Sequence, residues 1–443
     1  MLKKRKRVGK KGAAKAAAAG APEAAVEDVD VDSDAEDSDD PAPGAKAARS
    51  LEEAEDDFFE TADEKRVRVA KEYLRSLESS GAGTAGASVQ ERLEKDVAEG
   101  QRRARVQVRN LSLGEPQFRR GHKESVTCLA LSADERTLFS GGQDCAILRW
   151  DVETGKKDVF PGGRNMFDCG GHFEQVHGVS LIESRGLLAS CGADRVVRFW
   201  DWRCPIGSKC TRYLFGHAGT ATCIRADPDG NQVYSGSLDK SMKVWDLRGM
   251  RCQDTLFGHV EGLTSMDIYM KGRPVTASTD KTLRVWKVDK DTHLMFSKHT
   301  YSVDATAALD AERCVSGSQD GKLMLWTHSS KKPVAAATVD AGEWVTALAA
   351  VQGGNVVFSS GTSGQLRAWQ AVAAGGETDG KKVSTTLTPV CPPVALPGCP
   401  NAIAVGQRLV VVGVGKCHRL GGWFFDKRNR NGVVMLPLSY DKA

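Results

Sequence analysis

The pattern of apolar and polar positions changes character twice along this chain. Residues 1–57 are rich in Ala, Gly, Pro, Asp and Ser and have almost no aromatic or β-branched residues. Burial cannot offset the conformational entropy of ordering such a segment, so we predict a disordered tail over residues 1–57. In residues 110–443, short apolar stretches with alternating polar positions lie between turns rich in Gly, Ser and Asp. This pattern predicts many short strands.

Between these two regions, residues 58–109 have apolar residues at helical spacing. The first candidate helix follows a capping box at Thr61 and has apolar side chains along one face: Val67, Ala70, Leu74 and Leu77. The second follows a capping box at Ser88, with a similar face: Val89, Leu93 and Val97. Isolated helices of this length are marginally stable in water. We therefore expect a short helical segment that packs on the body of the protein or on another subunit.

Four residue types recur together five times after Gly121. A His precedes a Trp by 27 or 28 residues, an Asp stands six residues before that Trp, and a hydroxyl residue stands four residues before the Asp. The five sets are His122, Ser140, Asp144 and Trp150; His172, Ser190, Asp194 and Trp200; His217, Ser235, Asp239 and Trp245; His259, Thr276, Asp280 and Trp286; His299, Ser316, Asp320 and Trp326.

Two degenerate copies follow these five. One keeps Ser359 and Trp369 but has Ser363 at the Asp position, and the other leads from Val410 to Trp423. Repeats of 40 to 45 residues that end in Trp are typical of the WD-repeat blades of β-propellers. Seven copies predict an all-β fold: a seven-bladed WD-repeat propeller over residues 110–443, preceded by the helical segment and the disordered tail.

The recurring side chains have a structural interpretation. Asp, His, Ser or Thr, and Trp are expected to meet in each blade as a buried hydrogen-bonded network, and losing one member would cost roughly 1–3 kcal/mol. The strand residues between Asp and Trp suggest an exposed basic position, such as Arg198. An open sheet edge invites aggregation, so we expect the segment around Phe118 to add the outer strand of the last blade.

Several kinds of chemistry find no support in the sequence. The stretch Gly413 to His418 superficially resembles a dinucleotide-binding loop, but it lacks the third glycine and the acidic residue that binds ribose. No nucleophile elbow, phosphate-binding loop or zinc-ligand spacing is present, so we predict no enzyme activity, cofactor or metal. No transmembrane span or secretory signal is expected either. The 12 cysteines are interpreted as reduced, mostly buried side chains of an intracellular protein.

The charge is unevenly distributed. Residues 1–22 hold eight Lys or Arg and no acidic residue, whereas residues 23–64 hold 18 acidic residues against two basic ones. The basic run that predicts nuclear import is Lys3, Lys4, Arg5, Lys6 and Arg7. A basic run before the propeller and a mixed basic and aromatic stretch near the C-terminus are candidates for contact with RNA phosphates and bases. These candidates are Arg102, Arg103, Arg105, Arg109, His418, Arg419, Lys427, Arg428 and Arg430.

Two stretches carry a resemblance to a known family. Glu60–Leu77, ahead of a WD propeller, and the closing motif Val412–Trp423 resemble the 55-kilodalton WD-repeat subunits of the U3 small nucleolar ribonucleoprotein. The chain departs from that family pattern at Gly422 and at Phe424–Phe425, where a basic residue and a second Trp are more typical. The resemblance covers about residues 58–440.

The resemblance implies a nucleolar, non-catalytic protein. Members bind the box B/C motif of U3 RNA together with a small kink-turn-binding protein, and they act with small-subunit processome proteins in early pre-ribosomal RNA cleavage. A second hypothesis is a protein-only adaptor, because Trp200–Arg203 and Trp245–Arg248 have the W-D-x-R form found in substrate receptors of cullin-RING ubiquitin ligases.

Overall fold

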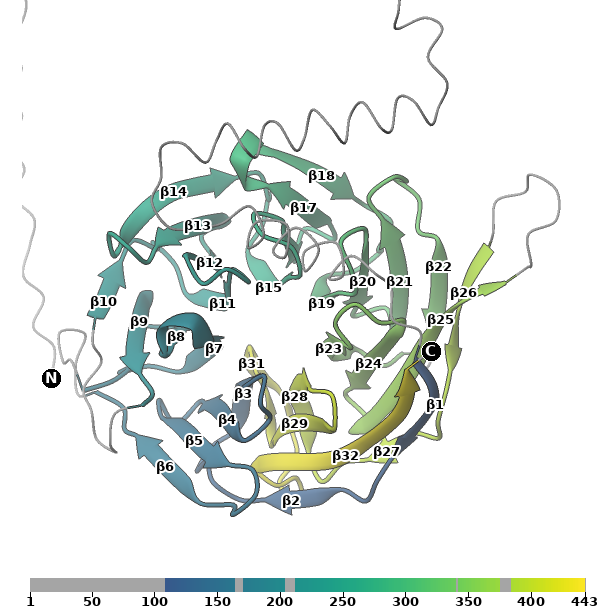
Figure 1. Ribbon diagram of the computed structural model, residues 1–443, viewed down its shortest axis with the longest axis horizontal. Coiled ribbons are helices and arrows are strands. Elements are labelled where there is room, and N and C mark those ends of the chain that lie inside the picture. The colour runs from purple at the N-terminus through teal and green to yellow at the C-terminus, as the bar shows by residue number, and fades with distance from the viewer. Residues whose placement is uncertain (1–107, 164–169, 204–211, 340–341, 375–383, 443) are drawn as a thin grey trace, which may run out of the picture. The chain divides into compact units, whose positions relative to one another are not determined.

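The computed structural model describes residues 108–163, 170–203, 212–339, 342–374 and 384–442. In these residues, seven antiparallel sheets are arranged in a ring (Figure 1), and their inner strands line a central pocket, which we call the channel. The predicted seven-bladed propeller is confirmed. The tail predicted over residues 1–57 lies outside the described residues, as does the predicted helical segment except for Val108 and Arg109, which are in a strand.

Blades 1 to 5 each consist of four strands, numbered from the channel outward. Blade 1 contains β3 (Val126–Leu131), β4 (Thr137–Gly142), β5 (Ile147–Asp151) and β6 (Lys157–Phe160). Blade 2 contains β7 (Val176–Ile182), β8 (Leu187–Gly192), β9 (Val196–Asp201) and β10 (Arg212–Phe215). Blade 3 contains β11 (Ala221–Ala226), β12 (Gln232–Ser237), β13 (Ser241–Asp246) and β14 (Arg251–Phe257).

The next two blades continue this order around the ring. Blade 4 contains β15 (Leu263–Ile268), β16 (Pro274–Ser278), β17 (Leu283–Lys287) and β18 (Thr292–Phe296). Blade 5 contains β19 (Val303–Ala308), β20 (Arg313–Ser318), β21 (Lys322–Thr327) and β22 (Ala335–Thr338). Two short 3₁₀ turns, Glu183–Arg185 and Val288–Lys290, lie in the turns of blades 2 and 4. No helix in the described part of the chain is long and apolar enough to span a membrane.

Blade 6 has a longer outer region than the others. It contains β23 (Val345–Ala350), β24 (Val356–Gly361), β25 (Gln365–Ala374), β26 (Ser384–Pro389) and the short β27 (Val394–Ala395). Strands β25 and β26 project beyond the rim of the ring (Figure 1).

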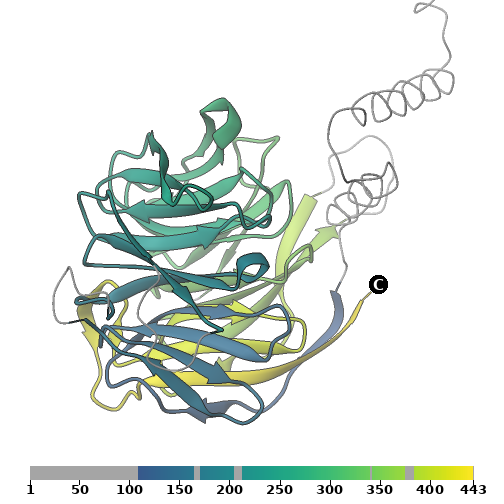
Figure 2. The ribbon, with the colours of Figure 1, turned by 60° about the vertical axis from the view of Figure 1, so that its left-hand side comes forward.

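Blade 7 closes the ring with strands from both ends of the propeller. It contains β28 (Cys399–Val405), β29 (Leu409–Gly415) and β32 (Gly432–Lys442), and β1 (Val108–Leu113) supplies its outer strand. The short β2 (Gln117–Arg119) also pairs with β32, through Phe118 and Val434. The prediction that the segment around Phe118 adds to the last blade is therefore confirmed, and β1 and β32 run side by side (Figures 1 and 2).

The predicted phase of the seventh repeat is wrong. A copy that leads from Val410 to Trp423 would place Trp423 at the end of the third strand of the blade, as the other Trp residues are, but that strand is β32, which begins at Gly432. Residues between β29 and β32 instead form a separate hairpin of β30 (Cys417–His418) and β31 (Gly421–Phe425). The seventh repeat has lost the His, Ser and Asp that fix the phase elsewhere, so spacing alone misplaced its tryptophan.

The apolar core lies between neighbouring blades. Between blades 1 and 2, for example, Phe160 packs edge-on against Trp200, with ring centroids 5.8 Å apart. Arg198 on β9 is fully buried, contrary to the exposed basic position predicted for it. Its guanidinium lies 3.6 Å from the carboxylate of Asp194 and 5.8 Å from the ring of Tyr213, which supply the charge and the cover that water would otherwise provide.

Candidate nucleic-acid interface

The recurring polar residues meet inside the blades. In blade 3, Trp245 Nε1 donates to Ser235 Oγ at 2.7 Å, and this oxygen lies 2.7 Å from His217 Nε2. His217 Nδ1 lies 3.1 Å from Asp239 Oδ2. Because a carboxylate only accepts, Nδ1 carries the proton and donates to it. In the neutral imidazole Nε2 then accepts from the serine hydroxyl, whose oxygen accepts from the indole. Equivalent contacts join the residues of blades 1, 2 and 4: His122, Ser140, Asp144, Trp150, His172, Ser190, Asp194, Trp200, His259, Thr276, Asp280 and Trp286.

Blades 5 and 6 have weaker versions of this network. In blade 5, Ser316 still accepts from Trp326 at 2.7 Å, but His299 Nδ1 and Asp320 Oδ1 are 3.8 Å apart. The hydroxyl of Thr300 donates to Asp320 instead, at 3.1 Å. In blade 6, Trp369 donates to Ser359 at 2.7 Å.

The network ties the turn after the second strand to the loop that enters the blade. Asp239, for example, also accepts a hydrogen bond from the backbone N–H of Ala218 at 2.9 Å. Burial would raise the pKa of Asp239, but hydrogen bonds from His217 and Ser241 outweigh it and hold the pKa below its usual range. These hydrogen bonds engage the polar atoms within the blade, which fits a structural role. No group of three or more His, Cys, Asp or Glu in the described residues could hold a metal ion.

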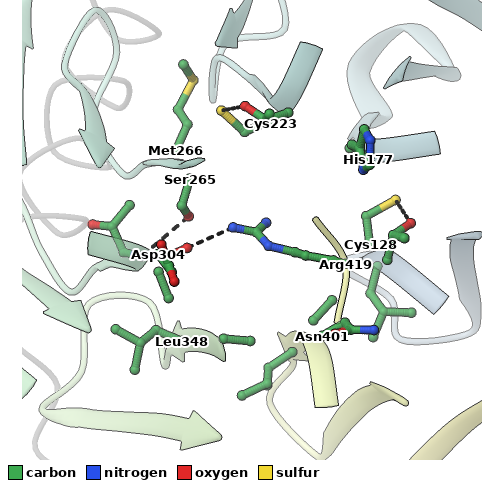
Figure 3. Close-up of a pocket in the computed structure, with 18 of the residues that line it drawn as sticks. Cys128, His177, Cys223, Ser265, Met266, Asp304, Leu348, Asn401 and Arg419 are labelled. Atoms are coloured by element: carbon green, nitrogen blue, oxygen red, sulfur yellow. Dashed lines mark hydrogen bonds between the residues drawn. The ribbon is translucent and has the colours of Figure 1, made fainter. Parts of the chain in front are cut away.

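The structure places two of the predicted RNA contacts, His418 and Arg419, against other parts of the ring. His418 is 1% exposed, which leaves it no surface for a ligand. Arg419 extends into the channel toward Asp304 (Figure 3), and its Nη2 donates to the backbone carbonyls of Thr264 and Asp304 at 2.8 and 2.7 Å. His418 is therefore buried, whereas Arg419 is half-buried with its guanidinium held inside the ring.

The other predicted contacts fall into separate places. Lys427, Arg428 and Arg430 lie together and exposed on the loop between β31 and β32. Arg109 is exposed on β1 but pairs with Asp441 near the far end of β32, about 30 Å from the loop at 3.3 Å per residue. Arg102, Arg103 and Arg105 lie outside the described residues, as does the import run Lys3 to Arg7.

Two further exposed residues, Lys123 and Phe425, lie beside the cations of the loop between β31 and β32. Asn431 accepts from the backbone N–H of Lys416 and donates to the backbone carbonyl of Lys123, both at 2.9 Å, so the loop packs beside the entry to blade 1. Lys123 is exposed there, and Phe425 is 57% exposed at the start of the loop. We call this group the cationic loop surface: Lys123, Phe425, Lys427, Arg428 and Arg430.

Sequence spacing could have pointed to Lys123, because it follows His122 in the loop that enters blade 1. The loops that enter the blades and the turns after their second strands lie at the same end of the ring, joined by contacts such as Lys123 N–H to Asp144. The cationic loop surface therefore belongs to the face that carries the His–Asp pairs. Arg430 is held there by its position over the ring of Phe118, 6.0 Å from the centroid.

Comparisons with known proteins agree with this architecture. The WD domain, G-beta repeat family matches residues 114–151, 163–201, 208–246 and 250–287. The chain is 30% identical to "U3 small nucleolar RNA-interacting protein 2" of Mus musculus, over 86% of this chain and 82% of the mouse protein. It is 27% identical to "U3 snoRNP-associated protein-like EMB2271" of Arabidopsis thaliana, over 87% and 88% of the two chains.

Solved structures show the same likeness. The "Structure of U3-55K" superposes with a TM-score of 0.66 at 29% identity and covers 73% of this chain and 98% of that one. The "Crystal structure of RRP9 WD40 repeats" has a TM-score of 0.67 at 29% identity and covers 74% and 100%.

Proposed function

The chain belongs to the U3 small nucleolar RNA-interacting protein 2 family of WD-repeat proteins, and from this premise we propose that it is a non-catalytic, RNA-binding subunit of the U3 small nucleolar ribonucleoprotein. In this proposal the propeller binds the box B/C region of U3 RNA together with a kink-turn-binding protein. It thereby supports early pre-ribosomal RNA processing alongside other small-subunit processome proteins. The run Lys3 to Arg7 directs nuclear import, and the protein works in the nucleolus.

The observation that carries this proposal is the cationic loop surface. Four exposed cations and one exposed aromatic ring lie on adjoining loops of blades 1 and 7, and Asp426 is engaged by the backbone N–H of Arg428 at 2.9 Å. Cations of this kind neutralise phosphates and release counterions, and an exposed ring can stack on an unpaired base. The kink-turn-binding protein supplies the specificity that phosphate contacts lack.

The test is RNA binding by the purified full chain with a box B/C transcript and the kink-turn-binding protein, measured at several salt concentrations. The variant Lys427→Glu/Arg428→Glu reverses two charges that make no side-chain contact essential to the ring. We expect affinity to fall at least about ten-fold and the slope of log K against log salt to become shallower by about 1.4, at 0.7 per phosphate contact.

A matched control reverses two exposed lysines on a loop of blade 5, Lys331→Glu/Lys332→Glu. It has the same net charge change, so it should bind nearly as the unaltered chain does. Equal losses in both variants would show a general charge effect, and no loss in the first would exclude the cationic loop surface. The adaptor hypothesis makes a different forecast: the main partners would stay bound to the immunoprecipitated protein after RNase treatment.

A further inference from the structure

The β30–β31 hairpin is tied at its base to blades 1 and 7. The backbone N–H of Cys417 donates to Ser125 Oγ at 3.0 Å, and the carbonyl of Cys417 accepts from Asn401 Nδ2 at 2.9 Å. Gln143 of blade 1 donates to the carbonyl of His418 at 3.3 Å. From this base β31 lies inside the ring of inner strands, next to the channel (Figure 1).

Arg419 extends this attachment across the channel. It follows β30 directly and points toward Asp304 (Figure 3), and its Nη2 donates to the carbonyls of Thr264 on β15 and Asp304 on β19, in blades 4 and 5. One side chain thus joins blade 7 to two blades that lie 115 and 155 residues away in sequence. Hydrogen bonds from a charged donor are stronger than those between neutral groups, and more so where little water competes.

The carbonyl of Asp304, one of the two acceptors for Arg419, belongs to the blade in which a recurring hydrogen bond between neighbouring inner strands is missing. At the same position on most inner strands, a side chain donates to a carbonyl of the next blade; these residues are Thr127, Thr222, Thr264, Thr346 and Asn401. Blade 5 has Asp304 at this position, and a carboxylate cannot donate. Its oxygens instead accept from Ser302 and Gln319, at 2.7 and 2.8 Å, which leaves negative charge near the guanidinium of Arg419.

We propose that Arg419 is a positioning residue for RNA binding: by fixing the β30–β31 hairpin across the channel, it holds the cationic loop surface in its binding arrangement. Only β31, which ends at Phe425, separates the Arg419 turn from Lys427, so movement of the hairpin moves the loop. Binding energy is lost whenever a loop must be ordered on association, and a preformed loop avoids that cost. This inference rests on the proposed function.

The test removes the channel contact and leaves every surface charge in place. In Arg419→Met, amide hydrogen exchange over residues 417–428 should be faster than in the unaltered chain, without RNA present. Affinity for the box B/C transcript with the kink-turn-binding protein should fall about ten-fold, because the loop must then be ordered on binding. The salt slope should stay unchanged, because the phosphate contacts are the same. Arg419→Lys keeps a charged donor and should recover part of both losses.

A matched control is Arg185→Met. Arg185 also bridges two blades, donating from blade 2 to the carbonyl of Leu247 in blade 3 at 3.1 Å, but it lies on a turn far from the hairpin. It should change neither exchange over residues 417–428 nor RNA affinity.

The outcomes separate the two proposals. Unchanged exchange over residues 417–428 in Arg419→Met overturns the positioning role, whether or not the protein binds RNA. Faster exchange with full RNA affinity also overturns it. If the unaltered chain binds no RNA, the proposed function fails by itself. Should Arg419→Met not fold, Arg419→Gln keeps one amide donor and is judged by the same two measurements.

Discussion

Replacing the central hydroxyl of one blade network tests the energetic role of these polar residues. Ser235→Ala in blade 3 removes the acceptor of Trp245 Nε1 and the donor to His217 Nε2, which lie in a fully buried setting. Each buried polar group that loses its partner costs roughly 1–3 kcal/mol. With two such groups, we expect the free energy of unfolding to fall by about 3 kcal/mol, near the lower part of the summed range.

The chain offers its own control for this substitution. In blade 6, Ser359 accepts from Trp369 in the same way, but no histidine occupies the position of His217. Ser359→Ala therefore leaves one buried group without a hydrogen-bond partner rather than two. The free energy of unfolding should fall by about half as much, roughly 1–2 kcal/mol.

Urea denaturation followed by tryptophan fluorescence measures both values, provided that the slope m is the same for each variant. Equal losses for the two serines would refute the idea that the histidine contact carries energy of its own. A loss below about 0.5 kcal/mol for Ser235→Ala would refute the unsatisfied-partner argument as a whole.

Two further predictions concern the channel and the closing blade. Burial lowers the pKa of His177 and of His418 from 6.5 to about 4. Between these two pH values the unfolded chain takes up protons that the folded chain does not. The stability that these histidines contribute is therefore fully present above pH 6.5 and is lost as the pH falls from 6.5 to 4. The slope is at most about 1.4 kcal/mol per pH unit for each histidine, and urea denaturation across this range should give a shallower slope for His177→Asn. In Gly415→Ala the new Cβ would lie 2.3 Å from Cβ of Ser125, which has little freedom to move, so we expect a loss of about 1–3 kcal/mol in the same assay.

The sequence predicts well those features that are set by local spacing. The His, Ser, Asp and Trp of a blade lie within about one repeat of each other, so their spacing shows that they share a blade. The apolar and polar alternation identified the strands, but it could not show that Arg198 is buried. A strand has the same period of two whether its polar face meets water or a neighbouring blade, and only the fold reveals Asp194 and Tyr213 around that guanidinium.

The interface could be predicted only in part, for a related reason. The polar sequence around Lys427 and Arg428 predicts a loop, and therefore predicts that these two cations are exposed. The internal position of Arg419 depends on acceptors in blades 4 and 5, and nothing in the closing motif indicates them. The association of Lys123 with the loop likewise requires the ring to bring residues 123 and 431 together.

Closure of the ring by β1 and β32 has a consequence for how the protein is made. Asn110 and Asp441, joined by a side-chain hydrogen bond of 2.9 Å, are 331 residues apart. At about 5–20 residues per second, a ribosome needs on the order of 20–60 s to travel between them. Throughout that time β1 has no strand with which to pair. Because β32 supplies the only pairing edge for β1 among the described strands, β1 can join a sheet only after blade 7 has been synthesised.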